Sequence, residues 1–209
     1  MIPMDVLLSF LTASILLSLA PGPDNIFVLT QSAVDGPRAG IMVMLGLCTG
    51  LIFHTIAVAM GVAVIFQTSA LAFAALKYLG AAYLVYLAFL AFRAGNLDLA
   101  SGEKTPPLAA FALYRRGIVM NITNPKVSIF FLAFLPQFTD PSRGSLTLQM
   151  LVLGAVFIFS TFWVFGGIAL LAGRLGRWLG QSARAGRILN RGAALVFIGL
   201  AAKLALVER

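Results

Sequence analysis

Long apolar stretches separated by short polar segments dominate the chain, and this pattern predicts helices that cross a membrane. A helix needs about 20 mostly apolar residues to span a bilayer. Six stretches are close to that length or longer, at residues 6–34, 39–66, 69–92, 117–138, 146–173 and 188–206. We therefore expect an all-α integral membrane protein with six transmembrane helices.

One segment, residues 96–107, has the composition of a soluble loop, with Asp98, Glu103, Lys104 and a pair of prolines. It divides a single transmembrane domain, residues 1–209, into a half at 1–95 and a half at 111–209, with a linker at 96–110. Each half holds three spans, so the second half enters the membrane from the opposite side. The sequence thus predicts two inverted three-helix repeats, an arrangement found in many secondary transporters.

Composition agrees with a membrane protein and removes several chemistries. The 209 residues are 60% hydrophobic and 11% charged, unlike a soluble globular domain. Cys48 is the one cysteine and His54 the one histidine, so neither a disulfide nor a His-rich metal site can form within the chain. No Gly-rich stretch ends in the Gly-Lys-Ser/Thr of a phosphate-binding loop. We predict no metal, no cofactor and no nucleotide hydrolysis.

The positive charges are distributed unequally between the two sides of the predicted membrane domain. The formal net charge is +8, but the basic residues flank apolar spans instead of forming an exposed surface, which argues against nucleic acid. Ten of the 15 Lys and Arg follow spans one, three and five: Arg38, Arg93, Lys104, Arg115, Arg116, Arg174, Arg177, Arg184, Arg187 and Arg191. Four lie on the other side: Lys77, Arg143, Lys203 and Arg209. Because cytoplasmic loops collect positive charge, we expect both termini in the periplasm.

Two of the spans are interrupted by polar motifs that contain proline. Span one contains Pro21-Gly22-Pro23-Asp24-Asn25, and span four contains Asn121-Ile122-Thr123-Asn124-Pro125-Lys126. Each is the first span of its half. Proline lacks a backbone N–H and displaces the carbonyl one turn earlier, so each motif leaves unpaired backbone groups at membrane depth. Such backbone persists only inside protein or beside a water-filled cavity, which favours a site for a small zwitterion or ion over two simple kinks.

Asp24 and Lys126 are both expected near the middle of the membrane. Asp24 precedes Asp35, at the end of span one, by eleven residues, and Lys126 follows Arg116 by ten. At the helical rise both charges lie about 15 Å from the cytoplasmic boundary, half of a core that is about 30 Å thick. A lone charge there costs at least about 2.5–3.5 kcal/mol, so we expect the two to face each other. They form either a structural ion pair or a site in which an amine meets Asp24 and a carboxylate meets Lys126 or the N-terminus of a broken helix. Asp24 can also carry a coupling proton.

The motifs give a short set of candidate residues. Those expected to bind substrate or protons are Asp24, Asn25, Asn121, Asn124 and Lys126. Those expected to break the helices are Pro21, Gly22, Pro23 and Pro125. His54, eight residues after the first glycine of a Gly46-x-x-x-Gly50 pattern, is a candidate proton relay. A hydrogen-bonded packing histidine explains it equally well.

At these motifs the chain resembles the family of bacterial amino-acid efflux permeases that contains lysine exporters and threonine/homoserine exporters (LysE/RhtB type). The resemblance covers nearly the whole chain: APGPDN in span one, the Gly-rich second span, LKYLGAAYLVYLAF in the third and NITNPKVSIFFLAFLPQF in the fourth. The Pro-Gly-Pro element corresponds to residues 21–23 and the Asn-Pro-Lys element to 124–126. The resemblance implies a six-helix inner-membrane protein that exports amino acids or close derivatives with the proton gradient instead of ATP. It does not name the amino acid.

The sequence therefore predicts a secondary active transporter of the bacterial cytoplasmic membrane, coupled to protons. Its expected partners are a small zwitterionic substrate, protons, a bilayer whose anionic headgroups meet the arginines of 174–191, and a second copy in a homodimer. Simple anchoring of the topology is the preferred role of those arginines. A membrane-embedded enzyme or redox carrier is the alternative from another class, although the lone Cys48 disfavours electron transfer. A passive channel is the third hypothesis, and uphill flux that collapses with an uncoupler distinguishes a transporter from it.

Overall fold

The computed structural model describes residues 2–62, 70–94, 108–181 and 183–206, and the regular elements in these ranges are helical. In chain order they are α1 (Met4–Leu19), α2 (Pro23–Asp35), α3 (Pro37–Ala57), the π-helix η1 (Val58–Val62), α5 (Ala70–Arg93), α6 (Ala110–Ile122), α7 (Pro125–Ile129), the π-helix η2 (Phe130–Phe134), the 3₁₀ helices η3 (Leu135–Phe138) and η4 (Pro141–Arg143), α8 (Leu146–Gln181) and α9 (Ala183–Leu206).

Within the described ranges, four segments are each long and apolar enough to cross a membrane: Pro37–Gly61, Ala74–Arg93, Leu146–Ala172 and Gly186–Leu206. Two further spans are bent pairs. Helices α1 and α2 meet at 60°, and α6 meets the segment Pro125–Phe138 at 49°. Counting each pair as one span gives up to six spans, which confirms the all-α fold and the interruption of spans one and four. The relation of the halves as inverted repeats stays a prediction.

The largest differences from the boundaries expected from apolar composition are at the start of α6 and the end of α8. Helix α6 begins at Ala110 and not at 117, and α8 continues to Gln181, beyond 173. Arg116 lies within α6, with its guanidinium 4.7 Å from the ring centroid of Phe27 in α2. A polar helix that leaves the bilayer keeps its backbone hydrogen bonds in water, so apolar composition marks the membrane boundary and not the helix end. Of the predicted linker 96–110, residues 96–107 lie outside the described residues.

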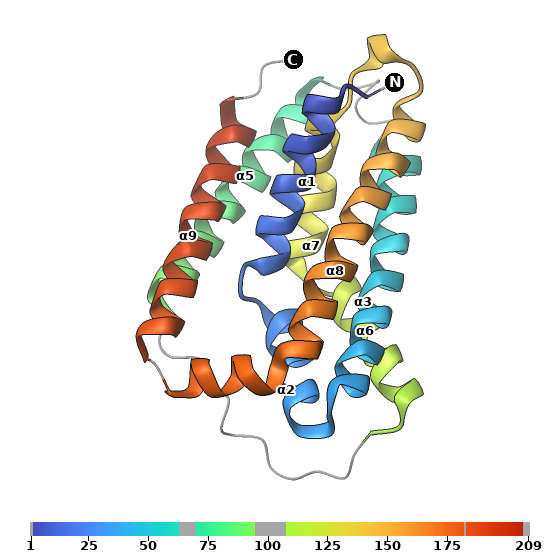
Figure 1. Cartoon of the computed structure of the whole chain (residues 1–209). Helices are drawn as coiled ribbons and strands as arrows, with labels where there is room; N and C mark the ends of the chain where they lie inside the picture. Colours follow the sequence, from blue (N-terminus) through green and yellow to red (C-terminus); the bar gives the residue numbers. More distant parts are fainter. Residues whose placement is uncertain (1, 63–69, 95–107, 182, 207–209) are drawn as a thin grey trace.

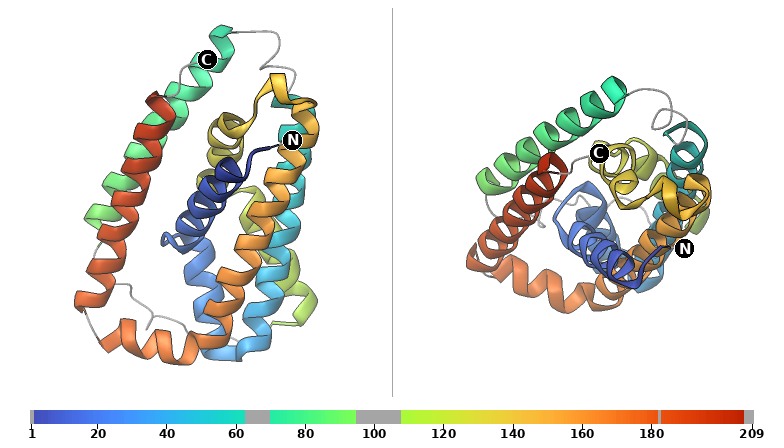
Figure 2. Two further views of the ribbon diagram at one scale, coloured as in Figure 1. Left: turned by 45° about the horizontal axis from the view of Figure 1, so that its top comes forward. Right: turned by 90° about the horizontal axis from the view of Figure 1, so that it is seen from above.

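The helices form two unequal groups. Helices α3 and α8 pack with the two bent spans, whereas α5 and α9 lie side by side and form one wall of the molecule (Figures 1 and 2). Both breaks lie about half-way along the bundle, and α1 starts at the end where α9 finishes (Figure 1). The interrupted spans therefore bring their polar motifs to the same level in the middle of the structure.

Glycine allows α3 and α6 to cross with their backbones in contact. A Cβ atom on Gly46 would lie 2.1 Å from the carbonyl oxygen of Tyr114, and one on Gly117 would lie 2.3 Å from that of Val43. Neither position has room for a side chain. Small residues at a crossing are how membrane helices approach closely, since lipid gives no hydrophobic drive between them.

A cluster of phenylalanine rings fills the core between the two breaks and the end of the bundle where α1 begins. Phe130 of η2 lies 4.9 Å from Phe134, 5.0 Å from Phe157 of α8 and 6.0 Å from Phe10 of α1, measured between ring centroids. Phe10, Phe130 and Phe134 are at most 1% exposed. This packing fixes the second half of span four against the first half of span one.

The connection before α8 is held by its own polar groups. Asp140 Oδ1 accepts from Ser142 Oγ at 2.7 Å, and Asp140 Oδ2 accepts from Arg143 Nε at 2.8 Å. These bonds from Ser142 and Arg143 lower the pKa of the Asp140 carboxyl to about 2. Gln149 Nε2 donates to the Asp140 carbonyl at 2.9 Å and so ties this turn to α8.

We predict that Gly46→Ala destabilises the protein because the new methyl group must push α6 away from α3. Overpacking of this kind costs about 1–3 kcal/mol. The thermal midpoint in detergent should therefore fall by several degrees, at about 2–4 °C per kcal/mol for a chain of this size. The matched control is Gly167→Ala, because a Cβ on Gly167 meets nothing within 4 Å. Equal midpoints for both variants would show that the crossing is not tightly packed.

Candidate functional site

The two helix breaks share one local design. Pro23 and Pro125 each occupy the first turn of the helix that follows, where the missing N–H has no helical partner to lose. Asn124 caps α7, since its Oδ1 accepts from the backbone N–H of Lys126 at 3.0 Å. Gly22 precedes α2 with extended backbone and no side-chain cap. Each polar motif thus ends one short helix and starts another in the same span.

Side chains satisfy backbone carbonyls at both breaks. Asn25 Nδ2 donates to the Ser18 carbonyl at 2.7 Å, within the first break. His54 Nε2 donates to the Asn121 carbonyl at 3.2 Å, which Pro125 cannot reach because it has no N–H. The same carbonyl accepts from the backbone N–H of Asn124 at 3.1 Å. A carbonyl left unpaired at membrane depth costs several kcal/mol, so these contacts stabilise the breaks.

Two further hydrogen bonds connect one break to the other. Lys126 Nζ, from the second break, donates to the Ala20 carbonyl of the first at 3.2 Å. Asn124 Nδ2, also from the second break, donates to Asp24 Oδ1 of the first. Asp24 and Lys126, both described, form no ion pair within 4.0 Å. The breaks are therefore cross-linked through Asn124 and Lys126, and each charge has a neutral partner.

Gly22 provides the space for the lysine. A Cβ on Gly22 would lie 2.9 Å from Lys126 Nζ and 3.8 Å from Asn25 Oδ1. Gly50 has the same role for Asn121, because a Cβ there would lie 2.6 Å from Asn121 Cβ and 2.7 Å from its Oδ1. The Gly46-x-x-x-Gly50 pattern in α3 thus serves both the helix crossing and the site.

The structure brings all five candidate binding residues together in the interior. Asp24, Asn25, Asn121, Asn124 and Lys126 are all buried, between 2% and 9% exposed. His54 is half-buried and reaches this group through the Asn121 carbonyl. Burying five polar side chains inside a membrane domain costs free energy, and such residues usually mark a functional site. This cluster is therefore the candidate site.

Two buried oxygen atoms in the cluster have no hydrogen-bond partner among the described residues: Asn25 Oδ1 and Asn121 Oδ1. Asn121 lines a small cavity of about 10 Å³ together with Asp24 and Lys126, a space for about one water molecule. Unpaired buried acceptors are rare and call for a donor. Water and the ammonium group of a substrate are donors of the right kind.

Ser18 and Thr161 also line this cavity, and the sequence did not single them out. Their hydroxyl oxygens lie 3.4 Å apart, with Ser18 on α1 and Thr161 on α8. The available signal was the Ser160-Thr161 pair, which lies between apolar residues in the middle of span five. Hydroxyl groups are common in membrane helices and often bond only to their own backbone, as Ser160 does to the Val156 carbonyl at 2.8 Å. Sequence alone therefore could not assign Thr161 to the site.

A larger opening lies on the other side of Lys126. The α5–α9 crevice, of about 430 Å³, lies between the two helix breaks and the inner faces of α5 and α9. Lys126 lines both this crevice and the small cavity. Its ammonium group is therefore the point where the polar interior meets a space large enough for a small molecule.

The geometry can be compared with known proteins. Residues 15–208 match the family model described as LysE type translocator. The chain belongs to this family. The match spans both helix breaks and every candidate binding residue, which confirms the resemblance inferred from the Pro-Gly-Pro and Asn-Pro-Lys motifs.

Proteins similar to the chain include two that are named for efflux. The chain is 37% identical to the homoserine/homoserine lactone efflux protein of Salmonella typhimurium, over 94% of each chain. It is 27% identical to the leucine efflux protein of Salmonella choleraesuis, over 96% of this chain and 94% of that one. An uncharacterized membrane protein of Vibrio cholerae is 35% identical over 83% of this chain and 84% of its own. No solved structure matches the chain.

As a member of the LysE type translocators, the chain is a multi-pass membrane transporter of an amino-acid efflux family and not an enzyme. This confirms the predicted class and sets aside the membrane-embedded enzyme and the redox carrier. Proton coupling, a homodimer and the orientation of the termini stay predictions. So do the roles of the individual site residues.

The contact of His54 generates a prediction that separates its two interpretations. His54→Leu removes a donor to the Asn121 carbonyl and should lower the free energy of unfolding by about 1 kcal/mol, the net value of one hydrogen bond. His54→Gln keeps an N–H donor without a group that titrates near neutral pH, so export should stay near the wild-type rate. The measurements are thermal unfolding in detergent and substrate efflux from vesicles. Loss of efflux in a stably folded His54→Gln protein would instead assign His54 to a proton relay.

Proposed function

We propose that this LysE type translocator exports a neutral amino acid or a close derivative across the bacterial cytoplasmic membrane, in exchange for protons. The observation that carries the proposal is the pair of helix breaks cross-linked by Asn124 and Lys126, with unpaired acceptors beside them. Similar proteins are named for efflux of homoserine, homoserine lactone and leucine. These names support a small neutral substrate.

The substrate binds with its ammonium group at Asp24 and its carboxylate at Lys126. Asn121 Oδ1, which has no hydrogen-bond partner in the described part of the chain, adds a hydrogen bond to the ammonium group. The carboxylate takes over Lys126 Nζ from the Ala20 carbonyl, which it contacts in this structure. Charge-assisted hydrogen bonds are roughly twice as strong as neutral ones, so a zwitterion competes well with these neutral partners.

Coupling follows if the proton and the substrate ammonium group compete for the Asp24 carboxylate. A substrate leaves the site when Asp24 is protonated, because the neutral carboxyl no longer attracts the ammonium group. The site returns empty with the proton and releases it on the cytoplasmic side. The substrate then binds more tightly to the ionised form of Asp24 than to the protonated form, and this difference in affinity couples export to proton uptake.

The packing of the helices supports two inverted halves that move against each other. Helix α3 of the first half packs against α6 of the second, and α8 of the second packs against α1 and α2 of the first. In the same way, α3 contacts α8, and α5 contacts α9. Exchanging the halves reproduces this set of pairings, as expected of an inverted repeat around a central site.

Export requires a defined orientation of the protein in the membrane, and we infer this orientation from the distribution of basic residues. Ten of the 15 Lys and Arg follow spans one, three and five in the sequence, so we assign the side where these spans end to the cytoplasm and both termini to the periplasm. The basic side carries the connection from α2 to α3, the end of α8 and the start of α9 (Figure 1). Substrate therefore enters from this side.

We predict that Lys126→Met and Asp24→Asn each reduce efflux by at least about 30-fold, since truncating one partner of a buried charged contact costs about 2 kcal/mol or more. The assay is efflux of labelled L-homoserine or L-leucine from preloaded vesicles that hold equal amounts of each variant. Lys77→Met is the control, because Lys77 lies in α5 outside both cavities, with its Nζ 4.7 Å from the centroid of the Tyr78 ring.

Two outcomes would contradict the proposal. Normal efflux from Lys126→Met at wild-type membrane levels would remove the lysine from the site. Uphill efflux that persists after an uncoupler has collapsed the proton gradient would remove proton coupling. Purely downhill flux would instead indicate a channel.

A further inference from the structure

The α5–α9 crevice has polar residues at the helix breaks on one side and mainly apolar residues of α5 and α9 on the other. The helix breaks supply Lys126 and Asn124, whereas α5 and α9 supply mainly apolar side chains. On α5 the lining residues Tyr83, Leu87 and Ala91 follow at intervals of four, which places them on one face of the helix. Lys126 is the charged residue among the described ones that line the crevice. A molecule held here meets one cation and an apolar wall.

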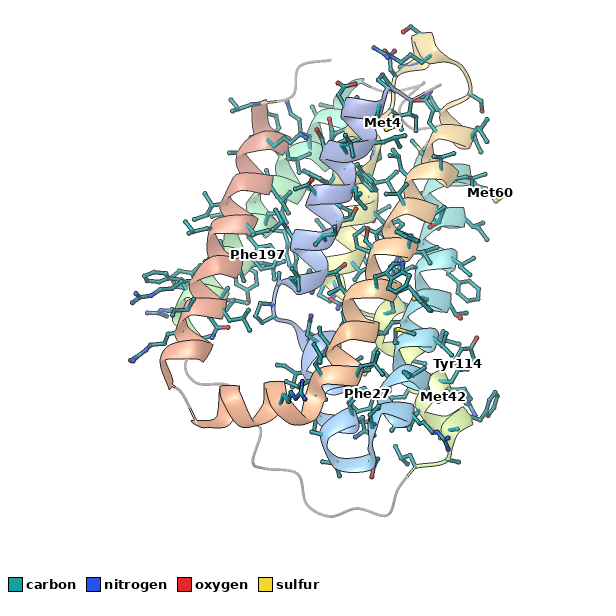
Figure 3. The ribbon with its side chains drawn as sticks, viewed as in Figure 1. Met4, Phe27, Met42, Met60, Tyr114 and Phe197 are labelled. Atoms are coloured by element: carbon teal, nitrogen blue, oxygen red, sulfur yellow. The ribbon has the colours of Figure 1, made fainter. Side chains whose placement is uncertain are left out.

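Helix α9 closes the crevice from the other side. Phe197 projects from α9 towards α1 (Figure 3) and is 2% exposed. Asn190, seven residues earlier on the same face, donates through Nδ2 to the Ala94 carbonyl of α5 at 3.3 Å. This bond joins α5 and α9 near the end of the crevice. The apolar wall is therefore a built surface between two helices that are fixed to each other.

We propose that this crevice is the side-chain pocket of the transporter and that α5 and α9 set its specificity, for substrates with an uncharged, apolar side chain. The inference rests on the proposed function, since Lys126 holds the carboxylate at the inner end of the same space. A volume of about 430 Å³ is within the range of small-molecule pockets, about 300–1,000 Å³. The side chain then extends from Lys126 along Leu87, Ala91 and Phe197.

The charge of the lining residues disfavours a substrate with a basic side chain. Among the described residues that line the crevice, none carries a carboxylate. A lysine-like substrate would bury its side-chain ammonium group against the apolar wall of Leu87, Ala91 and Phe197, where no described lining residue can pair with it. A basic side chain is therefore excluded, and an aliphatic one gains by leaving water.

The pocket is tested by changing its size at Ala91. Ala91→Leu fills part of the crevice, so efflux of L-leucine should fall by about tenfold, the lower bound for one methylene in a tight pocket. Efflux of the smaller L-alanine should change less than twofold. The matched control is Ala82→Leu, on the same helix but exposed and outside the crevice, and it should leave both rates unchanged. Ala91→Val provides a milder variant if Ala91→Leu lowers the amount of folded protein.

A change of charge gives a second, independent readout. Leu87→Asp places a carboxylate in the apolar wall and should allow L-lysine, which the wild type rejects, to compete with L-leucine. Equal loss of L-leucine and L-alanine efflux in Ala91→Leu, or no loss of either, would overturn the pocket while leaving the transporter intact. That result would fit a lipid chain in the crevice. Absence of efflux of every amino acid from the wild type would instead overturn the proposed function.

Discussion

Backbone groups left unpaired at helix breaks inside a membrane must find partners, and the arrangement of this structure depends on that constraint. In this chain, side chains supply the hydrogen bonds that a continuous helix would have made with its own backbone. Asn25 serves the Ser18 carbonyl within its own break, and Lys126 crosses from the second break to the Ala20 carbonyl of the first. Because some partners come from the other half of the chain, satisfying the backbone also brings the halves together. The polar groups that bind each other in this state are those that we propose to bind the substrate.

The close helix crossings follow from the same requirement. Gly50 leaves room for Asn121, and Gly22 leaves room for the Lys126 ammonium group. Larger residues at either position would move the polar side chains away from their partners by the width of a methyl group. The polar side chains of the site can reach their positions because the neighbouring segments carry glycine at these two points. The phenylalanine cluster around Phe130 then fills the core above the breaks and excludes water from that part of the interior.

Much of this arrangement could be predicted from the sequence. Apolar length predicted the spans, and proline at equivalent places in spans one and four predicted the breaks, since both signals depend on local covalent chemistry. The common level of the two breaks, about half-way along the bundle, followed from the helical rise. The partners of Asp24 and Lys126 did not, because whether a lysine meets a carboxylate or a carbonyl depends on distances of about 1 Å between helices far apart in the chain. Thr161 and the α5–α9 crevice were missed for the same reason. A wall formed by one face each of α5 and α9 has no signal in either helix alone.

The central claim is that the polar groups at the two helix breaks bind the substrate. The most direct test is equilibrium binding of L-leucine and L-homoserine to the purified protein in detergent, followed by calorimetry and by the shift in thermal unfolding. A ligand at 100 times its Kd stabilises the folded state by about 2.7 kcal/mol. The wild type and the Ala82→Leu protein should show this stabilisation with at least one of the two amino acids, and the Lys126→Met protein should show none. Equal binding to the wild type and to Lys126→Met would place the substrate elsewhere and leave the cross-linked breaks with a structural role alone.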